Sequence, residues 1–568
     1  MVALGDVKRW NASTLEQVFQ TVQQHQQVLV SSGDDFHGVL PIESWEGQAA
    51  ETMADAHKSL FSALDYLAAG TTIVNKTVAQ AADAIPAVQR DIADAEELAS
   101  KYGYQIQDDG SITDTLTNPG PNDPSPDDRA LAKQQITDTV TEALRTAGDI
   151  DNDLASVLKR ATTGGFGTGA ETTVQQAMAD GNQESPGEVL TTPPPNGTPS
   201  QNAAWWNSLS AEGQKILLHD HPDWLGNLNG IPGSVRSTAN LARLPGLLDQ
   251  AKARLAQIQA EVKQEDPYGW NPLADAESFK LNQELQAAEA DVNSLLQVQS
   301  TMRNPDRQLL VLDTSQPRVE AAIAVGNIDT AGNVAVFTPG FTTTVDGSLA
   351  GYDADMNNLQ HMSSKLTDKY GGPATATVTW IGYQAPQGDG VLIPDQSVAS
   401  PHQAQIGGNS LAQFYDGIGA VHALNQTPLH LTALGHSYGS TTTGYALSQN
   451  TPVNDAMLFG SPGQGAQHLN VPAGHLYDEH DQGDNLVPNL HGTLGPSPYY
   501  GSPDVVNSYQ MLSTDASTGS IFGPLNATSG HSGYLDNQST SLYNMAAVTS
   551  GHPNLVVDGT PHLAGGGH

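Results

Sequence analysis

The stretch LHLTALGHSYGSTTTGYAL, residues 429–447, places the pentapeptide Gly-His-Ser-Tyr-Gly between an apolar run and a run of small residues. The apolar run from Leu429 to Leu434 predicts a buried strand, and the small residues after the pentapeptide can form a helix. A serine at a sharp turn between strand and helix is typical of a nucleophile elbow, in which flanking glycines avoid Cβ clashes. Because G-x-S-x-G arises readily by chance in a glycine-rich chain, this context favours Ser437 as a nucleophile over a hydroxyl in a turn.

A serine hydroxyl attacks a carbonyl only when a base takes its proton and a carboxylate orients that base. In hydrolases with this elbow, the acid follows the serine along the chain and the histidine comes last. The predicted acid is Asp484, which follows the strand-like run LYDEH in residues 476–480 and precedes the apolar Leu486. Asp481 and Asp478 are the alternatives.

The predicted base is His531, in the Ser-Gly loop of NATSGHSGYL, residues 526–535, ahead of a helix-like run. The alternatives are His491 and His552, and any of these histidines could also be a surface imidazole. The order Ser437, Asp484, His531 is the one that a nucleophile elbow requires.

An oxyanion needs two preorganised N–H donors. The backbone amide of Tyr438, directly after the nucleophile, is the first predicted donor. The second is the amide of Phe341, or that of Thr342, in the loop that follows the strand-like run VAVFT, residues 334–338. The other interpretation of Pro339-Gly340 is a simple turn.

Short β-rich runs predict a sheet in residues 306–568. They are QLLVLDT (308–314), AAIAVGNI (321–328), NVAVFTPG (333–340), ATATVTWIGY (374–383), LHLTALGHS (429–437), DAMLFGSPG (455–463) and HLYDEHDQGD (475–484). The first three are close enough to pair as hairpins, whereas the later runs need crossovers that can hold helices. We therefore expect an α/β fold with a mixed, mostly parallel sheet.

Composition excludes several classes of function. The chain of 568 residues has room for two to four domains, and its net charge of −38 excludes nucleic-acid binding. Cysteine is absent, which excludes disulfides, thiolate catalysis and cysteine-built zinc sites. His219 and His221 lack a third imidazole nearby, so no metal site and no cofactor is predicted. The N-terminus lacks a secretory signal peptide, and no apolar window is long enough to span a bilayer.

Residues 1–160 predict a helical bundle. Apolar side chains recur at three- and four-residue steps in 11–32, 53–98 and 131–158, and Ser13 with Glu16 predicts a capping box. The Pro- and Gly-rich residues 161–203 predict a linker. Residues 204–305 contain two amphipathic runs, 236–265 and 273–302, and predict a helical arm or lid.

Trp45-Glu46-Gly47 lies between the first two predicted helices. A helix, a W-x-G turn and a second helix resemble the small W-x-G proteins that type VII secretion systems export from actinobacteria. Tyr104 and Asp108 match the Y-x-x-x-D/E signal of those proteins. The resemblance implies a small helical W-x-G partner or secretion machinery, and export to the medium or cell envelope without a signal peptide. A cytoplasmic location is the alternative.

Several blocks in order resemble an uncharacterised actinobacterial α/β-hydrolase family. They are WWNSLS, GNLNGIPGSVRSTAN, VAVFTPGFTTTV, TWIGYQAP, LGHSYGS, LFGSPG, GDNLVP and HSGYL, in residues 205–535. The resemblance implies an α/β-hydrolase fold and assigns the triad to Ser437, Asp484 and His531. We expect a serine esterase or lipase that acts on a lipid or cell-envelope ester. The alternatives are a peptidase or thioesterase with the same triad, and a secretion-associated binding or effector protein with an idle site.

Overall fold

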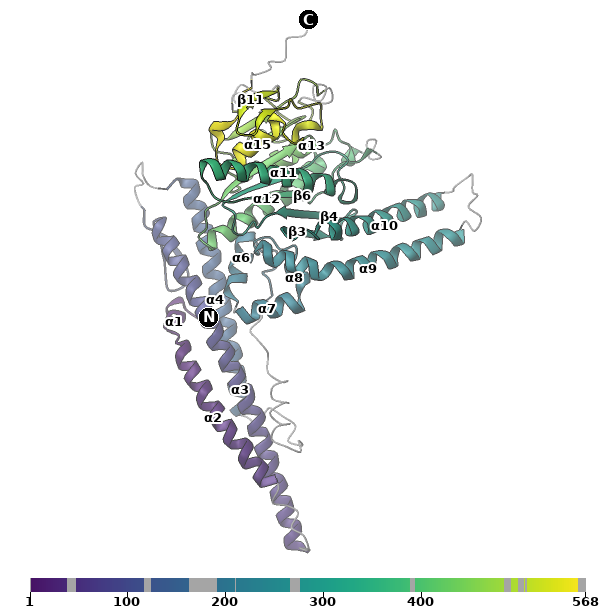
Figure 1. Ribbon diagram of the computed structural model, residues 1–568. Coiled ribbons are helices and arrows are strands. Elements are labelled where there is room, and N and C mark those ends of the chain that lie inside the picture. Colours follow the sequence, from purple (N-terminus) through teal and green to yellow (C-terminus); the bar gives the residue numbers. More distant parts are fainter. Residues whose placement is uncertain are drawn as a thin grey trace. The chain divides into compact units, whose positions relative to one another are not determined.

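The chain forms two compact units, Met1–Leu217 and Leu218–His568, which are described separately (Figure 1). The structure is a computed structural model that describes residues 2–37, 47–116, 124–162, 192–209, 211–265, 276–388, 394–484, 492–498, 505 and 508–559. Trp45 and Glu46 of the predicted W-x-G turn, the alternative base His491 and most of the predicted linker lie outside these residues.

The first unit is a helical bundle with a small hairpin. Its elements are α1 (Leu4–Arg9), α2 (Ala12–His37), α3 (Gln48–Lys101), β1 (Tyr104–Ile106), β2 (Ile112–Asp114), α4 (Pro126–Thr162) and α6 (Pro199–Ser208). The core lies where α1, α3 and α4 meet, with Val7, Val88, Ile92, Ile136 and Val140 buried in one cluster. The apolar spacing that predicts the helices therefore also selects the side chains that pack between them.

Helix α2 begins two residues earlier than the predicted capping box. Asn11 provides the cap, because its Oδ1 accepts hydrogen bonds from the amides of Ser13 (3.0 Å) and Thr14 (3.3 Å). The predicted box of Ser13 with Glu16 is wrong, since asparagine caps as well as serine does and lies two residues upstream. Helix α4 begins as its sequence indicates, with Ser125 Oγ accepting from the Asp128 amide at 3.1 Å.

The boundary predicted at residue 204 also differs from the structure. Helix α6 is capped by a reciprocal box of Thr198 and Gln201, and it packs against α3 and α4. Trp205 and Trp206 at its end are buried. Two large indoles need an apolar surface, and the bundle provides it, so residues 199–217 belong to the first unit and not to the arm.

The second unit is built on an eight-stranded sheet with the order β10-β9-β8-β7-β5-β6-β4-β3. The strands are β3 (Arg307–Asp313), β4 (Glu320–Val325), β5 (Asn333–Thr338), β6 (Thr375–Ile381), β7 (His430–His436), β8 (Asp455–Phe459), β9 (Leu476–Glu479) and β10 (Gln510–Leu512). β3 pairs with β4 and β4 with β6 in antiparallel fashion, and the remaining pairs are parallel. The predicted mixed, mostly parallel sheet is confirmed.

One predicted pairing is wrong. The first three strands do not form consecutive hairpins, because β5 lies between β6 and β7 and not beside β4. All six residues of β5 are buried, which is the burial of a central strand with neighbours on both sides. The short β4–β5 connection therefore reverses the chain direction but leaves the position between the two strands to β6.

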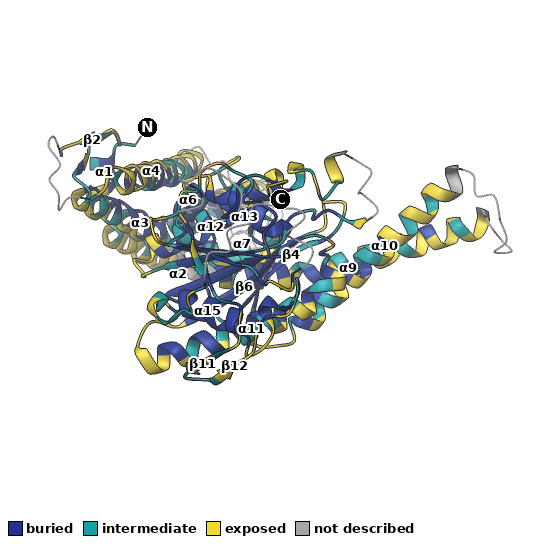
Figure 2. Cartoon of the chain, turned by 90° about the horizontal axis from the view of Figure 1, so that it is seen from above, coloured by how far each residue is buried: buried dark blue, intermediate teal, exposed yellow. Residues whose placement is uncertain are grey.

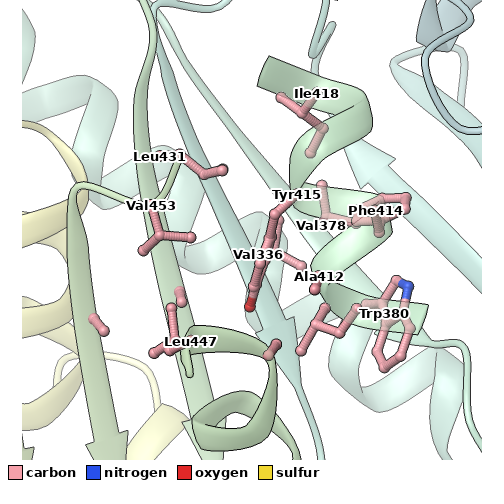
Figure 3. Close-up of a cluster of buried hydrophobic side chains, with 14 of the residues drawn as sticks. Val336, Val378, Trp380, Ala412, Phe414, Tyr415, Ile418, Leu431, Leu447 and Val453 are labelled. Atoms are coloured by element: carbon pink, nitrogen blue, oxygen red, sulfur yellow. The ribbon is translucent and has the colours of Figure 1, made fainter. Parts of the chain in front are cut away.

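Helices cover both faces of the sheet. They are α11 (Val345–Tyr370), α12 (His402–Leu424), α13 (Tyr438–Leu447) and α15 (Thr540–Thr549). α12 packs with α13, and α11 packs with α15 on the other face (Figure 1). Alternate residues of β5 enter the two cores, with Val336 in one and Phe337 in the other. Figure 3 shows Val336, Val378 and Leu431 of the sheet meeting Tyr415 of α12.

The arm predicted from its apolar spacing consists of α9 (Gly233–Glu265) and α10 (Ala276–Thr301). Its root packs on β3 and α11, where Leu248, Leu295 and Leu309 share a core cluster. Figure 2 shows that the described arm is largely exposed beyond this root. β3 is the edge strand, and β4, β6 and β5 separate it from β7, so the root lies far across the sheet from Ser437.

The block GNLNGIPGSVRSTAN protects that sheet edge. The side chain of Asn227 donates to the carbonyl of Leu312 (2.9 Å) and accepts from its amide (2.8 Å). Ser237 Oγ accepts from the amide of Leu309 (3.0 Å), and Asn240 donates to its carbonyl (3.1 Å). These side chains thus form hydrogen bonds with backbone groups of β3 that could otherwise pair with another strand.

A buried carboxylic acid makes the bundle sensitive to pH. Asp91 on α3 is 5% exposed, and its Oδ2 has no hydrogen-bond partner within the described residues. Burial raises the pKa of Asp91 to about 7, and Asp94 and Glu142 add to this effect while Arg90 opposes it. Because the folded bundle holds this proton more tightly than the unfolded chain does, its stability falls as pH rises from about 4 to about 7.

We expect Asp91→Asn to remove this dependence. One pKa unit corresponds to about 1.4 kcal/mol, so the variant should be more stable than the wild type by up to about 4 kcal/mol at pH 8. At pH 4 the two should be equally stable. Urea unfolding followed by circular dichroism measures both, with Asp83→Asn, an exposed position on the same helix, as the control. An identical pH response in wild type and Asp91→Asn would contradict the interpretation.

Candidate functional site

Ser437 occupies a strained turn between β7 and α13. Its φ of 54° and ψ of −130° lie in a region that side chains rarely adopt. A Cβ at Gly435 would lie 2.7 Å from Ser440 Cα, and one at Gly439 would lie 2.2 Å from the Thr338 carbonyl oxygen. Both glycines are therefore needed so that strand, turn and helix can approach closely.

Gly340 brings the loop after β5 against this turn. A Cβ there would lie 2.8 Å from both the Ser437 Cβ and the Tyr438 nitrogen. The amides of Tyr438 and Phe341 are thereby close to each other, and within the described residues neither donates to a protein acceptor. The amide of Thr342, the alternative donor, is occupied because it donates to the Pro386 carbonyl at 2.9 Å.

The three side chains predicted as a triad lie in one hydrogen-bonded row. His531 Nε2 is 2.9 Å from Ser437 Oγ, and His531 Nδ1 is 2.8 Å from Asp484 Oδ2. They come from the turn after β7, the loop after β9 and the loop before α15, so the carboxyl edge of the parallel strands brings them together. A hydroxyl, an imidazole and a carboxylate joined in this order can act as nucleophile, base and orienting acid.

The alternative residues lie elsewhere. Asp478 is within β9, and Asp481 Oδ2 accepts a hydrogen bond from the amide of Gly530 at 2.7 Å. His552 lies beside Tyr370, with a distance of 5.8 Å between the ring centroids. Of the histidines that the structure describes, His531 contacts the Ser437 hydroxyl.

The carboxylate of Asp484 is held in a buried environment. Its side chain is fully buried, and the Tyr534 hydroxyl donates to Oδ2 at 3.3 Å. Tyr534 in turn accepts from the Asp481 amide at 2.9 Å. Burial raises the pKa of Tyr534, so its hydroxyl stays protonated and remains a donor to the carboxylate.

His436 is a further group at the site. Its Nε2 is 2.8 Å from the carbonyl oxygen of His531, and its ring is stacked on Phe459. Burial and the neighbouring His531 lower the pKa of His436 to about 4, so it is neutral at physiological pH. Neither His436 nor Tyr534 was identifiable from sequence, although both stand inside the blocks LGHSYGS and HSGYL, because their contacts join segments far apart in the chain.

Within the described residues, no group of three or more His, Asp or Glu side chains is arranged to hold a metal ion. His219 pairs with Asp220, while His221 stacks on Trp224, so the H-x-H imidazoles have different partners. In the same part of the chain, no helix is long and apolar enough to cross a bilayer.

A cavity of about 430 Å³ lies between the β8–β9 loop and the start of β10. Leu469, Val471 and Leu476 line it, together with Gln464 and Tyr509. Ser437 and His531 are not among its lining residues, so this cavity does not define the substrate.

Comparison with known proteins places the chain in a family. Residues 314–492 match the family described as Alpha/beta hydrolase. The chain is 34% identical over 233 residues to uncharacterized protein Mb0988c of Mycobacterium bovis, which covers 39% of this chain and 82% of that protein. It is 30% identical over 400 residues to uncharacterized protein Rv2079 of Mycobacterium tuberculosis, which covers 66% of this chain and 59% of that protein. The chain belongs to the alpha/beta hydrolase family.

The chain spans about three fifths of the length of the Mycobacterium tuberculosis relative. Among solved structures, it is similar to the esterase domain of a Rhodothermus marinus protein, with 13% identity and a TM-score of 0.24. That similarity covers 44% of this chain and 99% of the esterase domain.

We expect Gly439→Ala to destabilise the hydrolase unit by about 1–3 kcal/mol or more, because the new Cβ meets two backbone carbonyls that cannot move independently. Gly351→Ala on α11 is the matched control, since a Cβ there meets nothing within 4 Å and helix propensity favours alanine by up to about 1 kcal/mol. Urea unfolding midpoints compare the two variants. Equal midpoints would show that the turn has room for a side chain.

Proposed function

We propose that this protein is a serine hydrolase that cleaves an ester-type bond through an acyl-enzyme. The proposal rests on the row of Ser437 Oγ, the His531 imidazole and the Asp484 carboxylate, joined at 2.9 and 2.8 Å. Membership of the alpha/beta hydrolase family supports hydrolysis in general. The strained backbone of Ser437 supports a functional role for that residue in particular.

In the proposed reaction, Ser437 Oγ attacks the carbonyl carbon while His531 Nε2 takes its proton. Asp484 orients the imidazole and stabilises the imidazolium that forms. The proton then passes to the leaving group, and a water molecule activated by His531 releases the acyl group from Ser437. The partners on both ring nitrogens of His531 favour this transfer, because they fix the tautomer with the proton on Nδ1.

The negative charge of the tetrahedral intermediate would be stabilised by the amides of Tyr438 and Phe341. Both amides lie beside the nucleophile across Gly340, and neither is used within the described protein. Tyr438 is also the first residue of α13, whose N-terminus favours negative charge. No organic cofactor or metal is needed for this chemistry.

The proposed substrates are lipid or cell-envelope esters. A peptidase or a thioesterase would use the same three residues, so the residues at the site leave these alternatives open. A panel of p-nitrophenyl esters of increasing acyl length, a thioester and a peptide anilide would separate the three. The highest kcat/KM identifies the class.

We expect a fluorophosphonate probe to label the wild-type protein covalently, and Ser437→Ala to abolish both the labelling and the hydrolysis of p-nitrophenyl acetate. The reason is that the probe reacts only with an activated serine. Ser448→Ala, at an exposed position after α13, is the control and should be labelled like the wild type. Mass spectrometry of the labelled peptide identifies the modified residue.

The same hydrolysis assay compares how much Asp484 and Asp481 contribute to kcat. Asp484→Asn should lower kcat by about 10⁴-fold, since the wrong imidazole tautomer is then favoured. Asp481→Asn should cost less, because Asp481 contacts the loop backbone and not the imidazole. Labelling that survives in Ser437→Ala would refute the proposal, and an unlabelled wild type would favour a binding or effector protein with an idle site.

We further propose that the helical unit binds a helical partner, in line with its resemblance to W-x-G proteins. Met53, Leu60 and Leu67 recur at seven-residue steps on α3, and they are 42%, 60% and 52% exposed. Val18 and Val28 on α2 are exposed as well. We call Met53, Leu60 and Leu67 the exposed heptad. Apolar side chains that repeat every seven residues on a helix surface are suited to packing against another helix.

Export by a type VII route, with a final location outside the cell or in its envelope, is the corresponding proposal for localisation. Tyr104 of the predicted signal is 8% exposed, and its hydroxyl donates to the Arg129 carbonyl at 3.1 Å. That tyrosine therefore has a packing role in the first unit. The exposed heptad, and not the Y-x-x-x-D spacing, carries the partner proposal.

We expect the wild type to appear in the culture medium of cells with the secretion machinery and to stay inside cells without it. Replacing Met53, Leu60 and Leu67 together with Gln should keep the protein inside both, because the apolar surface for a partner is lost. Replacing Gln23 and Gln24, exposed on α2, with Glu is the control and should leave release unchanged. Equal release of the heptad variant would contradict the partner proposal, and release without the machinery would contradict the route.

A further inference from the structure

The imidazole of His436 links the nucleophile to the proposed base. Its Nε2 lies 2.8 Å from the carbonyl oxygen of His531. A carbonyl oxygen only accepts, so His436 donates through a hydrogen on Nε2. The ring packs beside Phe459, with centroids 5.2 Å apart, and beside Tyr534, with centroids 5.8 Å apart.

The two histidines and the serine form a closed path. His436 and Ser437 are neighbours in the chain, and the Ser437 amide is anchored by donation to the Phe459 carbonyl at 3.1 Å. From the Ser437 hydroxyl, the path runs through the His531 imidazole to its own backbone carbonyl and back to the side chain of His436. The distance between hydroxyl and base is thereby set within the elbow itself.

A second contact restrains the same loop from its other side. The amide of Gly530, one residue before His531, donates to Asp481 Oδ2 at 2.7 Å. Hydrogen bonds at two consecutive residues restrict the backbone before and after the Cα that carries the imidazole. Of these two contacts, the one from His436 originates at the nucleophile turn, and only it can couple the positions of nucleophile and base.

We propose that His436 is a positioning residue of the hydrolytic site, which holds the His531 imidazole within reach of Ser437 Oγ through its hydrogen bond to the His531 carbonyl. This inference rests on the proposed function of Ser437 and His531. It assigns to the second residue of the Gly-His-Ser-Tyr-Gly motif a role that differs from nucleophile, base, acid or oxyanion donor.

The charge state of His436 suits this role. Its ring centroid is 4.9 Å from that of His531, which becomes a cation during the proposed reaction. A pKa of about 4 keeps His436 neutral over the working range of a hydrolase, so it does not repel that cation. The other titratable groups near it, Asp484 and Tyr534, are a carboxylate and a neutral phenol.

Two variants separate positioning from packing. His436→Phe keeps a ring on Phe459 but removes the donor, whereas His436→Gln keeps an N–H that can reach the same carbonyl. His361→Phe, an exposed histidine of α11, is the control for the exchange itself. Stopped-flow or steady-state hydrolysis of p-nitrophenyl acetate gives kcat and KM across pH 5 to 9 for each full-length protein.

We expect His436→Phe to lower kcat by about 10- to 100-fold with KM within about twofold of the wild type, because a small misplacement of the base costs this much. The pH profile of kcat/KM should also differ from that of the wild type, since the hydrogen bond to the His531 carbonyl is lost. His436→Gln should recover most of kcat, and His361→Phe should match the wild type. A wild-type kcat in folded His436→Phe, or a Gln variant as slow as the Phe variant, would overturn the proposal.

Nuclear magnetic resonance distinguishes failure of this inference from failure of the proposed function. Side-chain nitrogen shifts report the tautomer and pKa of His531 even in a protein with no activity. If the wild type neither hydrolyses esters nor reacts with a fluorophosphonate, the proposed function fails, and the His531 signals still decide the positioning role. A changed pKa or tautomer mixture in His436→Phe with recovery in His436→Gln supports it, and unchanged signals overturn it.

Discussion

The constraint on which the site depends is the close approach of three backbone segments at Ser437. The end of β7, the start of α13 and the loop after β5 meet where Gly435, Gly439 and Gly340 leave no space for a Cβ. This contact forces a positive φ on a residue that is not glycine. The strain is sustained because β5 and β7 are central strands whose side chains pack into cores on both faces. Without that packing, the serine would relax and its hydroxyl would lose its direction.

Hydrogen bonds at Ser437 join side chains from loops that the fold brings together. The carboxyl edge of the parallel strands collects loops from β7, β9 and the segment before α15, and so assembles Ser437, Asp484 and His531. Around them, the Asp481 amide donates to the Tyr534 hydroxyl, Tyr534 contacts the Asp484 carboxylate, and the Asp481 side chain contacts the Gly530 amide beside His531. The site is therefore supported by a shell of hydrogen bonds from rigid elements, which is a condition for preorganised catalysis.

The helical unit differs from the hydrolase unit in the composition of its core. Its core is made of small and branched residues between long helices, and it contains the buried acids Asp91 and Glu142. Burial raises the pKa of both carboxyl groups. The exposed heptad on α3 leaves apolar surface in water, whereas the hydrolase unit uses side chains to close even its sheet edge.

Local patterns in the sequence indicate most of the secondary structure. Period-two and period-3.6 apolar spacing predicts the strands from β3 to β9 and the helices α2, α3, α4, α9 and α10 within a few residues. The errors arise where equivalent local signals compete. Asn11 and Ser13 are both good caps, and a short connection such as that between β4 and β5 fits either a hairpin or a reversal that leaves room for a strand in between.

The sequence by itself determined the α/β class, the turn that presents Ser437 and the chain order of acid and histidine, because each depends on neighbouring residues or on general hydrolase chemistry. Only the tertiary structure decided that β5 is central, that Asp481 contacts a backbone amide, that the Thr342 amide is occupied and that His436 contacts the His531 carbonyl. These contacts join residues up to 97 positions apart. No local spacing encodes such distances, since they follow from how the sheet orders its strands.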